Sequence, residues 1–294
     1  MELLRTFMFA PGNHPRKVEK VFGLGADAVI LDLEDAVAVK EKIGARQAVI
    51  EAMKKPRQCK GYVRINATDT TFCYGDLRAV VGDWLDGLVL PKTESAAQLL
   101  MIDWLLSQLE RERGVVPGHI DLMPIIETGR GLAAAREIAS AGSRMHRLCF
   151  GAADYTRDMG MRWTMEESEL LPVRSEIVLA SRIAGIEPPI DTVFIHIGKH
   201  GDALRRTTQL ARDLGFQGKL CIHPEQVAPI NEIFTPSEAE VAHATKIVEA
   251  FKAAEASGSA SIQVEGHFVD YPVVEQARRV LAITEQLRAR KQEH

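Results

Sequence analysis

Short apolar segments alternate with segments of helical periodicity over about the first 235 residues of the chain. Most of the apolar segments are apolar throughout rather than alternating, which is typical of strands buried on both faces. The segments between them, such as Glu94–Leu109, Gly129–Ala141 and Glu169–Ala184, are rich in Ala, Leu, Glu and Arg and have helical spacing. The eight apolar segments of six to eight residues are Thr6–Pro11, Ala28–Asp35, Gly61–Asn66, Gly87–Lys92, Asp121–Glu127, Arg147–Asp154, Thr192–Ile197 and Gly218–Pro224.

This alternation predicts an α/β protein. Eight strand–helix repeats over about 230 residues match a (β/α)8 TIM barrel in number and length. A doubly wound parallel sheet is the competing architecture, but no G-x-G-x-x-G motif follows the first predicted strand. We therefore predict a single barrel.

The alternation stops after the eighth apolar segment. Ser237, with Glu240 three residues later, predicts the start of a helix that ends near Ala256. A small-residue linker follows at 257–261, then a hairpin at Ile262–Tyr271 and a charged amphipathic helix at Val273–Lys291. We expect a barrel domain at 1–235 and a C-terminal helix and lid extension at 236–294.

Composition and charge exclude several classes of protein. The 294 residues include 36 Lys and Arg against 40 Asp and Glu, a net charge of −4, whereas dedicated nucleic-acid binders usually carry a basic excess. No apolar run approaches the ~18 residues of a membrane helix, and the N-terminus has neither a secretory nor a transit-peptide pattern. The four cysteines are scattered, which favours reduced thiols over a zinc site or disulfides. We expect a cytoplasmic protein without nucleic-acid or membrane partners.

Ionisable residues gather at one end of the predicted strands. In a barrel of this kind the active site lies at the carboxyl ends of the strands, and unpaired buried charges there would cost several kcal/mol. Such a ring needs mutual pairing, a metal or a charged ligand. The residues concerned are Asp32, Glu34, Asp35, Arg64, Lys92, Glu127, Asp154 and His223.

The positions of these residues favour a divalent metal and an anionic substrate. Glu127 and Asp154 end adjacent strands and can converge, and two carboxylates with open coordination positions suit Mg²⁺. Arg64 offers a planar fork for a substrate carboxylate. Alternation along a strand places Asp32 and Glu34 on one face and Asp35 on the other. The alternative is a set of solvated charges and structural salt bridges.

Weaker signals lie elsewhere along the chain. Arg16 and Lys17 begin a predicted basic helix that either binds phosphate or is simply solvated. Small residues up to Ala153 would allow a ligand to approach the backbone before Asp154, or would allow close helix packing. His196, His200 and His223 lack the spacing of metal ligands, and we expect them either to have structural roles or to form hydrogen bonds with residues that contact the ligand.

Seven ordered motifs resemble the citrate lyase β-subunit-like family, which includes malyl-CoA, citramalyl-CoA and citryl thioester lyases. The resemblance spans nearly the whole chain, and the ordered set is specific although each fragment alone is weak. The motifs are FAPGN (Phe9–Asn13), LDLEDAV (Leu31–Val37), VRIN (Val63–Asn66), LPK (Leu90–Lys92), IIET (Ile125–Thr128), FGAADYTRDMG (Phe150–Gly160) and GKLCIHPEQV (Gly218–Val227).

The resemblance implies roles for individual residues. Glu127 and Asp154 would bind Mg²⁺, Arg64 would bind the substrate carboxylate, and Glu34 and Asp35 would border the metal site. The remaining expected contacts are Lys92 and Ala153 with substrate, and Arg16 and Lys17 with CoA phosphates.

The C-terminal segment GHFVDYPVVEQA (Gly266–Ala277) is similar to the lid of free-standing CoA-thioester lyases of the family. In its G-x-x-x-D-x-P motif the acidic residue is Asp270, which would reach the active site of a neighbouring subunit in a homo-oligomer, a trimer or a hexamer with exchanged lids. One departure is that the family usually has an acidic residue at the end of the seventh strand, where this chain has His196 and His200 and an acid only at Asp202.

These implications lead to a functional hypothesis. We expect a Mg²⁺-dependent carbon–carbon lyase that reversibly cleaves a carboxylated 3-hydroxyacyl-CoA, such as malyl-CoA or citramalyl-CoA, into acetyl-CoA and a 2-oxo acid. Asp270 would exchange a proton with the enolate carbon. Three alternatives stay open: a citrate lyase β subunit acting on an acyl carrier protein, a CoA-independent pyruvate aldolase, and a non-catalytic binding protein.

Overall fold

The structure, a computed structural model, describes residues 3–256 and 258–292. Contacts between Cα atoms divide the chain into two compact units, Leu4–Glu232 and a second unit made of Leu3 and the residues from Ile233 onward. The two units are described separately. Within the described residues, no helix is both long and apolar enough to cross a membrane.

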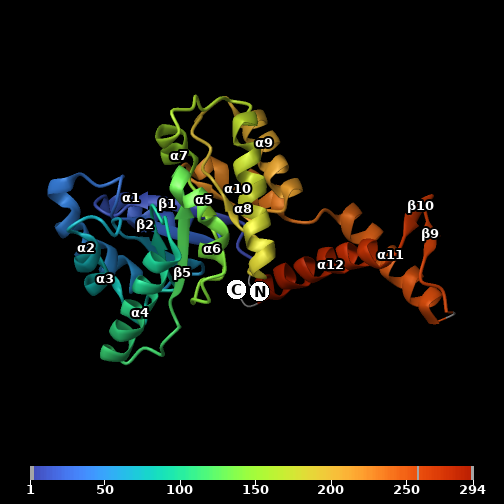
Figure 1. Cartoon of the computed structure of the whole chain (residues 1–294), viewed down its shortest axis with the longest axis horizontal. Coiled ribbons are helices and arrows are strands. Elements are labelled where there is room, and N and C mark those ends of the chain that lie inside the picture. Colours follow the sequence, from blue (N-terminus) through green and yellow to red (C-terminus); the bar gives the residue numbers. More distant parts are fainter. Residues whose placement is uncertain (1–2, 257, 293–294) are drawn as a thin grey trace. The chain divides into compact units, whose positions relative to one another are not determined.

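The first unit is a closed barrel of eight parallel strands in sequential order, which confirms the predicted TIM barrel (Figure 1). Each strand pairs with its two neighbours in the chain, and β1 closes the barrel against β8 through the pair Phe7 and Leu220. The strands are β1 Thr6–Pro11, β2 Ala28–Asp32, β3 Lys60–Arg64, β4 Gly87–Leu90, β5 Asp121–Ile126, β6 Cys149–Phe150, β7 Ile190–Asp191 and β8 Gly218–Cys221.

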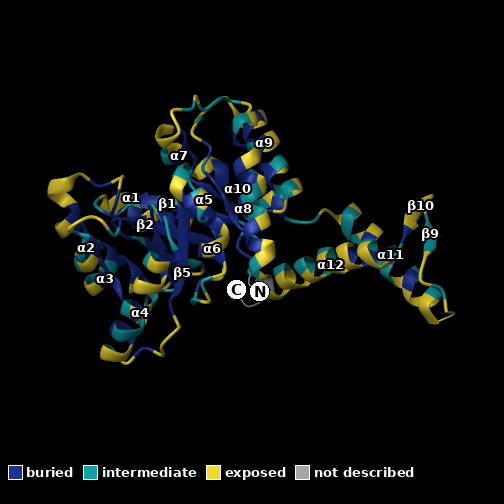
Figure 2. Cartoon of the chain, viewed as in Figure 1, coloured by how far each residue is buried: buried dark blue, intermediate teal, exposed yellow. Residues whose placement is uncertain are grey.

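Helices surround this barrel and cover the outer face of the strands. Figure 2 shows the strands as buried, while the helices alternate between buried and exposed positions. The helices of this unit are α1 Pro15–Val21, α2 Lys42–Met53, α3 Cys73–Val80, α4 Ala96–Glu112, α5 Gly129–Ala133, α6 Ala135–Ala139, α7 Ala152–Asp158, α8 Leu171–Ala184, α9 Gly201–Leu214 and α10 Val227–Phe234, with 3₁₀ turns at Val39–Glu41, Ser168–Leu170 and Pro224–Gln226.

The barrel interior is filled by apolar side chains from all eight strands. Phe7 and Tyr62 pack edge to face with ring centroids 5.3 Å apart. Because these side chains fill the barrel interior, polar chemistry is confined to the ends of the barrel. The other core members that line the interior are Leu4, Ala28, Ile30, Val89, Met123, Ile125, Cys149, Ile190 and Leu220.

The prediction for the seventh strand was wrong. The apolar segment Thr192–Ile197 was expected to be the strand, but β7 is Ile190–Asp191, and 192–197 form an irregular segment after it. The strand contains the fully buried Asp191, whose charge is compensated by Arg174 and Lys219. The predicted helix at Gly129–Ala141 is likewise divided, because α5 ends at Ala133 and α6 begins at Ala135.

The second unit is a helical hairpin with a small sheet. It consists of α11 Glu238–Ala256, the antiparallel strands β9 Ile262–Val264 and β10 His267–Val269, and α12 Tyr271–Gln292. The expected cap is present, because Ser237 Oγ accepts a hydrogen bond from the Glu240 amide while the Glu240 carboxylate accepts one from the Ser237 amide. Ser257 of the predicted linker lies outside the described residues. Phe251 and Val274 belong to the apolar core that joins α11 to α12.

Candidate active site

The last residues of β2 and β3 form the base of the polar end of the barrel. Asp32 and Arg64 are direct partners in the β2–β3 register. The guanidinium makes a bidentate pair, with Nε 2.8 Å from Oδ1 and Nη2 2.6 Å from Oδ2 of Asp32. Burial alone would raise the pKa of Asp32, but the Arg64 guanidinium outweighs it and the pKa is lowered. Arg64 is thus held rigidly, with its Cζ 5.0 Å from the Phe9 ring centroid.

Glu34 extends the Asp32–Arg64 pair towards β4. Its Oε2 lies 3.1 Å from Arg64 Nη1, and its Oε1 accepts a hydrogen bond of 2.5 Å from Lys92 Nζ. Burial raises the pKa of Glu34, and the nearby Arg64 and Lys92 offset that effect only in part. Asp35 was predicted to point to the opposite face, but its Oδ2 lies 3.9 Å from the same guanidinium. Strand alternation ends with β2 at Asp32, so the periodicity does not extend to Asp35.

Glu127 is a further buried carboxylate of the group. It follows β5, is 3% exposed, and accepts a hydrogen bond of 2.7 Å from the Lys92 backbone amide at Oε1. Burial raises its pKa to about 8, and the charges of Glu34 and Asp154 add to the rise while Arg64 opposes it. A carboxylate in this position is short of positive charge, which is the electrostatic condition that favours a cation.

Asp154 is the third residue of α7, directly after β6. Its Oδ1 pairs with Arg157 Nη2 at 2.6 Å, and Oδ2 accepts no hydrogen bond from the described residues. α7 is fixed at its start by a 2.9 Å hydrogen bond from the Ala152 amide to Thr192 Oγ1. The effect of Asp154 on the pKa of Glu127 reflects the proximity of the two carboxylates.

The donor set fits a magnesium ion. Five carboxylates (Asp32, Glu34, Asp35, Glu127, Asp154) face three cationic side chains (Arg64, Lys92, Arg157) in this network, so negative charge is in excess. Gly151 lies against Glu127, since an added Cβ would come within 2.5 Å of Oε2. Across the described ranges, no cluster of three or more His, Cys, Asp or Glu side chains is arranged to hold a metal. Two carboxylates suit Mg²⁺, which keeps several positions for water and substrate.

The other predicted residues lie outside this hydrogen-bonded network. Ala153 is an exposed residue in the first turn of α7, and Arg16 and Lys17 are exposed on α1. Sequence reasoning placed Asp32 at the strand end without assigning it a role, although it holds Arg64 in place. The signal was its in-register position opposite Arg64, which becomes visible only when the two parallel strands are aligned.

Asp270 belongs to the second unit and directly precedes α12. Its backbone carbonyl accepts the first helical hydrogen bond, from the Val274 amide, at 3.0 Å. Its carboxylate has no hydrogen bond or ion pair with any residue that the structure describes. A side chain that precedes a helix usually accepts a hydrogen bond from a backbone amide of the first turn. Pro272, the second residue of α12, has no amide hydrogen and cannot donate one to Asp270. Asp270 is therefore available for another partner.

The barrel and this end-of-strand carboxylate site define the class of protein as a TIM-barrel enzyme with a site for a divalent cation and an anionic substrate. Residues 5–224 match the model of the HpcH/HpaI aldolase/citrate lyase family, and the chain belongs to this family. The predicted enzyme class, a carbon–carbon lyase, is confirmed at this level.

Two curated relatives cover nearly all of the chain. The citrate lyase subunit beta of Leuconostoc mesenteroides subsp. cremoris is 39% identical over 96% of this chain and 93% of its own length. The L-malyl-CoA/beta-methylmalyl-CoA lyase of Cereibacter sphaeroides is 36% identical over 97% of this chain and 96% of its own length.

A solved structure provides a third comparison. CitE from Mycobacterium tuberculosis, determined in complex with magnesium, acetoacetate and coenzyme A, has a TM-score of 0.78 and 30% identity, covering 96% of this chain and 98% of that one. The family resemblance expected from the motifs is therefore confirmed.

Proposed function

We propose that the protein is a Mg²⁺-dependent lyase that reversibly cleaves a carboxylated 3-hydroxyacyl-CoA thioester, such as malyl-CoA or citramalyl-CoA, into acetyl-CoA and a 2-oxo acid. The single observation that carries this proposal is the buried Glu127 carboxylate, with its pKa raised to about 8, close to Asp154. The similarity to the relative named L-malyl-CoA/beta-methylmalyl-CoA lyase supports the substrate class.

Residues of the barrel hold the oxo-acid half of the substrate. Glu127 and Asp154 would hold Mg²⁺, which when bound supplies Lewis-acid charge at the reacting oxygen atoms. Arg64, kept rigid by Asp32, orients the substrate carboxylate with the guanidinium hydrogens that Asp32 leaves open. Lys92 and the backbone near Ala153 border the same space. Fixing the reacting groups in this way reduces the entropic cost of reaching the transition state.

The thioester half requires a proton at the carbon released by cleavage. Asp270 supplies this proton and removes it in the condensation direction, since its carboxylate is not engaged by the described residues. Arg16 and Lys17, exposed on α1, interact with CoA phosphates. The protein is a homo-oligomer, a trimer or a hexamer, in which Asp270 acts on a neighbouring barrel. The location is cytoplasmic, where the free thiols of Cys59, Cys73, Cys149 and Cys221 stay reduced.

A second candidate is the β subunit of a citrate lyase, acting on a citryl thioester of an acyl carrier protein. The observation that favours it is the 39% identity to the Leuconostoc citrate lyase subunit, against 36% to the malyl-CoA lyase. The two candidates differ in the carrier of the thioester rather than in the carbon–carbon bond that breaks.

A thioester panel tests both proposals. Purified protein with Mg²⁺ is given malyl-CoA, citramalyl-CoA, citryl-CoA and citryl-acyl carrier protein, and 2-oxo acid release is recorded. Turnover of a free CoA thioester, abolished by chelation and by Glu127→Gln, is the expected result. Turnover of the acyl carrier protein substrate alone would favour the second candidate. Cleavage of only free hydroxy-oxo acids would contradict both and indicate a CoA-independent aldolase.

A further inference from the structure

Lys42, the first residue of α2, carries a buried charge that no carboxylate pairs with directly. The residue is 8% exposed, and its ammonium forms no ion pair with a carboxylate within the described residues. A buried charge without such a partner is costly. The position adds to the cost, because the N-terminus of a helix is the positive end of its dipole. A lysine kept under both conditions points to a specific role.

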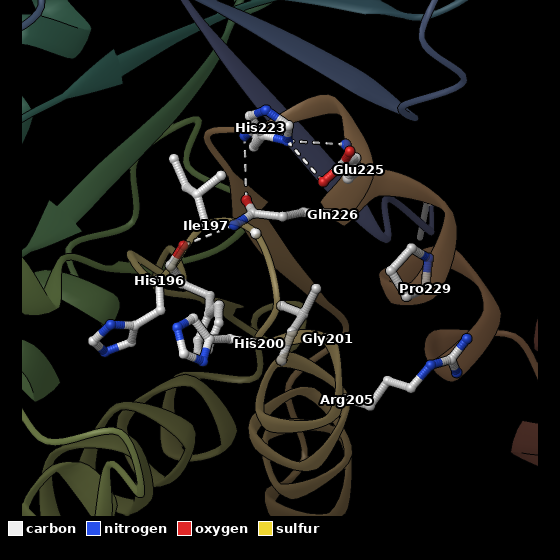
Figure 3. Close-up of a pocket in the computed structure, with 12 residues that line it drawn as sticks. His196, Ile197, His200, Gly201, Arg205, His223, Glu225, Gln226 and Pro229 are labelled. Carbon is white, nitrogen blue, oxygen red and sulfur yellow. Dashed lines mark hydrogen bonds and ion pairs between the residues drawn. The ribbon is translucent and has the colours of Figure 1, made fainter.

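Two other basic side chains at the same end of the barrel do not present this conflict. Figure 3 shows the pocket of about 220 Å³ formed by the loops after β7 and β8, where Arg205 points away from His200. Arg205 is 47% exposed and pairs with Glu232 at 2.7 Å. His223 caps the turn Pro224–Gln226 by accepting a hydrogen bond from a backbone amide. Arg205 and His223 thus have solvent or protein partners that account for their positions.

The Lys42 ammonium binds the backbone of the turn that carries the acidic residues Glu34 and Asp35. Residues 33–37 form this turn directly after β2, and we call it the acidic turn. Nζ donates hydrogen bonds to the carbonyls of Leu33, at 3.0 Å, and Glu34, at 2.6 Å. The Phe72 ring centroid lies 5.9 Å from Nζ and adds a cation–π contact. The carbonyls of the acidic turn are therefore the main acceptors for this buried cation.

Two charged groups hold the acidic turn, a carboxylate at its amides and the ammonium at its carbonyls. Asp32 accepts hydrogen bonds from the amides of Glu34, at 2.9 Å, and Ala36, at 3.0 Å. The same carboxylate makes the bidentate pair with Arg64. The carbonyls of Leu33 and Glu34 each have one further donor, so removing the ammonium should loosen the turn rather than unfold the barrel.

The charge of the site explains how a lysine can be buried here. Glu34 and Asp35 belong to the segment that the ammonium binds, so two carboxylates lie within one residue of the bound carbonyls. Their negative charge offsets part of the cost of burying a cation. In turn, the ammonium fixes the backbone from which the Glu34 side chain projects.

We propose that Lys42 is a positioning residue, which holds the acidic turn so that Glu34 stays in contact with Arg64 and Lys92. Glu34 Oε2 lies 3.1 Å from Arg64 Nη1, and its Oε1 lies 2.5 Å from Lys92 Nζ. A shift of the turn would lengthen both contacts and would weaken the alignment of the guanidinium with the substrate carboxylate. The effect on catalysis rests on the proposed function, whereas the effect on the turn does not.

Hydrogen exchange of the folded protein tests the hold of Lys42 on the acidic turn. Exchange is followed by mass spectrometry in peptides that span residues 33–41, without Mg²⁺ or thioester. We expect at least tenfold faster exchange in Lys42→Met, because the turn opens more often. Two controls should keep the wild-type rate in this segment: Lys40→Met, at an exposed position, and Leu106→Ala, which removes buried apolar contacts on α4. Lys42→Arg keeps the charge and the donors and should restore most of the protection.

Turnover by the same variants tests the effect on catalysis. With a thioester that the wild type cleaves, kcat/KM should fall at least tenfold in Lys42→Met and stay near the wild-type value in Lys40→Met and Leu106→Ala, so that lower stability alone is not the cause. Lys42→Gln, with the same expected direction, replaces a methionine variant that does not fold. Wild-type exchange in the folded variant, or wild-type kcat/KM, would overturn the proposal. A wild type that cleaves no thioester contradicts the lyase proposal instead, and the exchange rates then decide whether Lys42 holds the turn.

Discussion

The backbone amide of Lys92 donates a 2.7 Å hydrogen bond to Oε1 of Glu127. The same residue pairs with Glu34 through its side chain and has a φ of +47°, in the left-handed region. That conformation costs a non-glycine residue ~1–3 kcal/mol and persists only when the surroundings impose it. Lys92 therefore links the two carboxylates at the expense of local backbone strain.

Separate substitutions distinguish the backbone and side-chain roles of Lys92. Lys92→Gly keeps the amide and relieves the left-handed strain, whereas Lys92→Met keeps the strain, and both remove the ammonium. We expect the glycine variant to be more stable than the methionine variant by about 1 kcal/mol in urea unfolding. Both should lower kcat/KM because Glu34 loses the hydrogen bond from the Lys92 ammonium and keeps only Arg64 as a cationic partner. A glycine variant with wild-type kcat/KM would show that the ammonium has no part in the reaction.

Gly151 is a sensitive test of the proposed metal ligand Glu127. In Gly151→Ala the added Cβ would lie 2.5 Å from Glu127 Oε2 and 2.7 Å from its Cβ, so the carboxylate must move. We expect Mg²⁺ affinity, measured by calorimetry, to fall at least tenfold while the barrel stays folded. Gly44→Ala is the matched control, because it lies in α2 with nothing within 4 Å of the added Cβ. Equal Mg²⁺ affinity in the two variants would argue against Glu127 as a ligand.

The barrel could be predicted because its signal is local and repeated eight times. Continuous apolar segments mark strands buried on both faces, and their number sets the architecture. The seventh strand shows where this signal fails. Asp191 made the true strand look polar, and its partners Arg174 and Lys219 lie on α8 and β8, so no local pattern shows that its charge is compensated.

The candidate site could be predicted only in part. The motif positions identified Glu127, Asp154 and Arg64, whereas the bidentate pairing of Arg64 with Asp32 depends on the register of β2 against β3. The role of the Lys92 amide was also hidden, because backbone conformation at a loop residue is set by tertiary contacts. The sequence shows which ionisable residues lie at the strand ends, and the fold determines which of them pair with one another.

The buried ion pairs of Asp191 with Arg174 and Lys219 should make the free energy of unfolding depend on pH in the acid range. Burial alone would raise the pKa of Asp191, but Arg174 and Lys219 outweigh it and the pKa is lowered. The ionised form is thus favoured in the folded state. This stabilisation is present above the ordinary pKa of 3.8 and is lost as the pH falls through the lowered value.

Asp191→Asn tests this linkage. The variant should lose ~3–5 kcal/mol at neutral pH, because two buried cations keep fewer partners. Its free energy of unfolding, measured with urea from about pH 7 to pH 3, should then fall less steeply than that of the wild type in the acid range. Asp83→Asn, at an exposed position, is the control and should follow the wild-type curve. Parallel curves for Asp191→Asn and the wild type would contradict the assignment.

Asp270→Asn should abolish turnover while sparing the oxo-acid site. The carboxylate makes no hydrogen bond or ion pair within the described residues, so its loss should leave the melting temperature and Mg²⁺ affinity unchanged. We expect kcat to fall by about 10²–10⁴-fold, the usual contribution of a general acid–base group. Glu275→Gln, exposed on the same helix, is the matched control. Near-wild-type turnover by Asp270→Asn would exclude it as the proton donor.

Mixing two inactive variants tests whether Asp270 acts on a neighbouring subunit. Asp270→Asn has an intact Glu127, and Glu127→Gln has an intact Asp270, so a mixed oligomer formed by refolding them together contains some complete sites only if the two residues come from different chains. We expect activity to return in the mixture while each variant alone stays inactive. Activity that does not return, although mass spectrometry confirms mixed oligomers, would place Asp270 and Glu127 of each site in one chain.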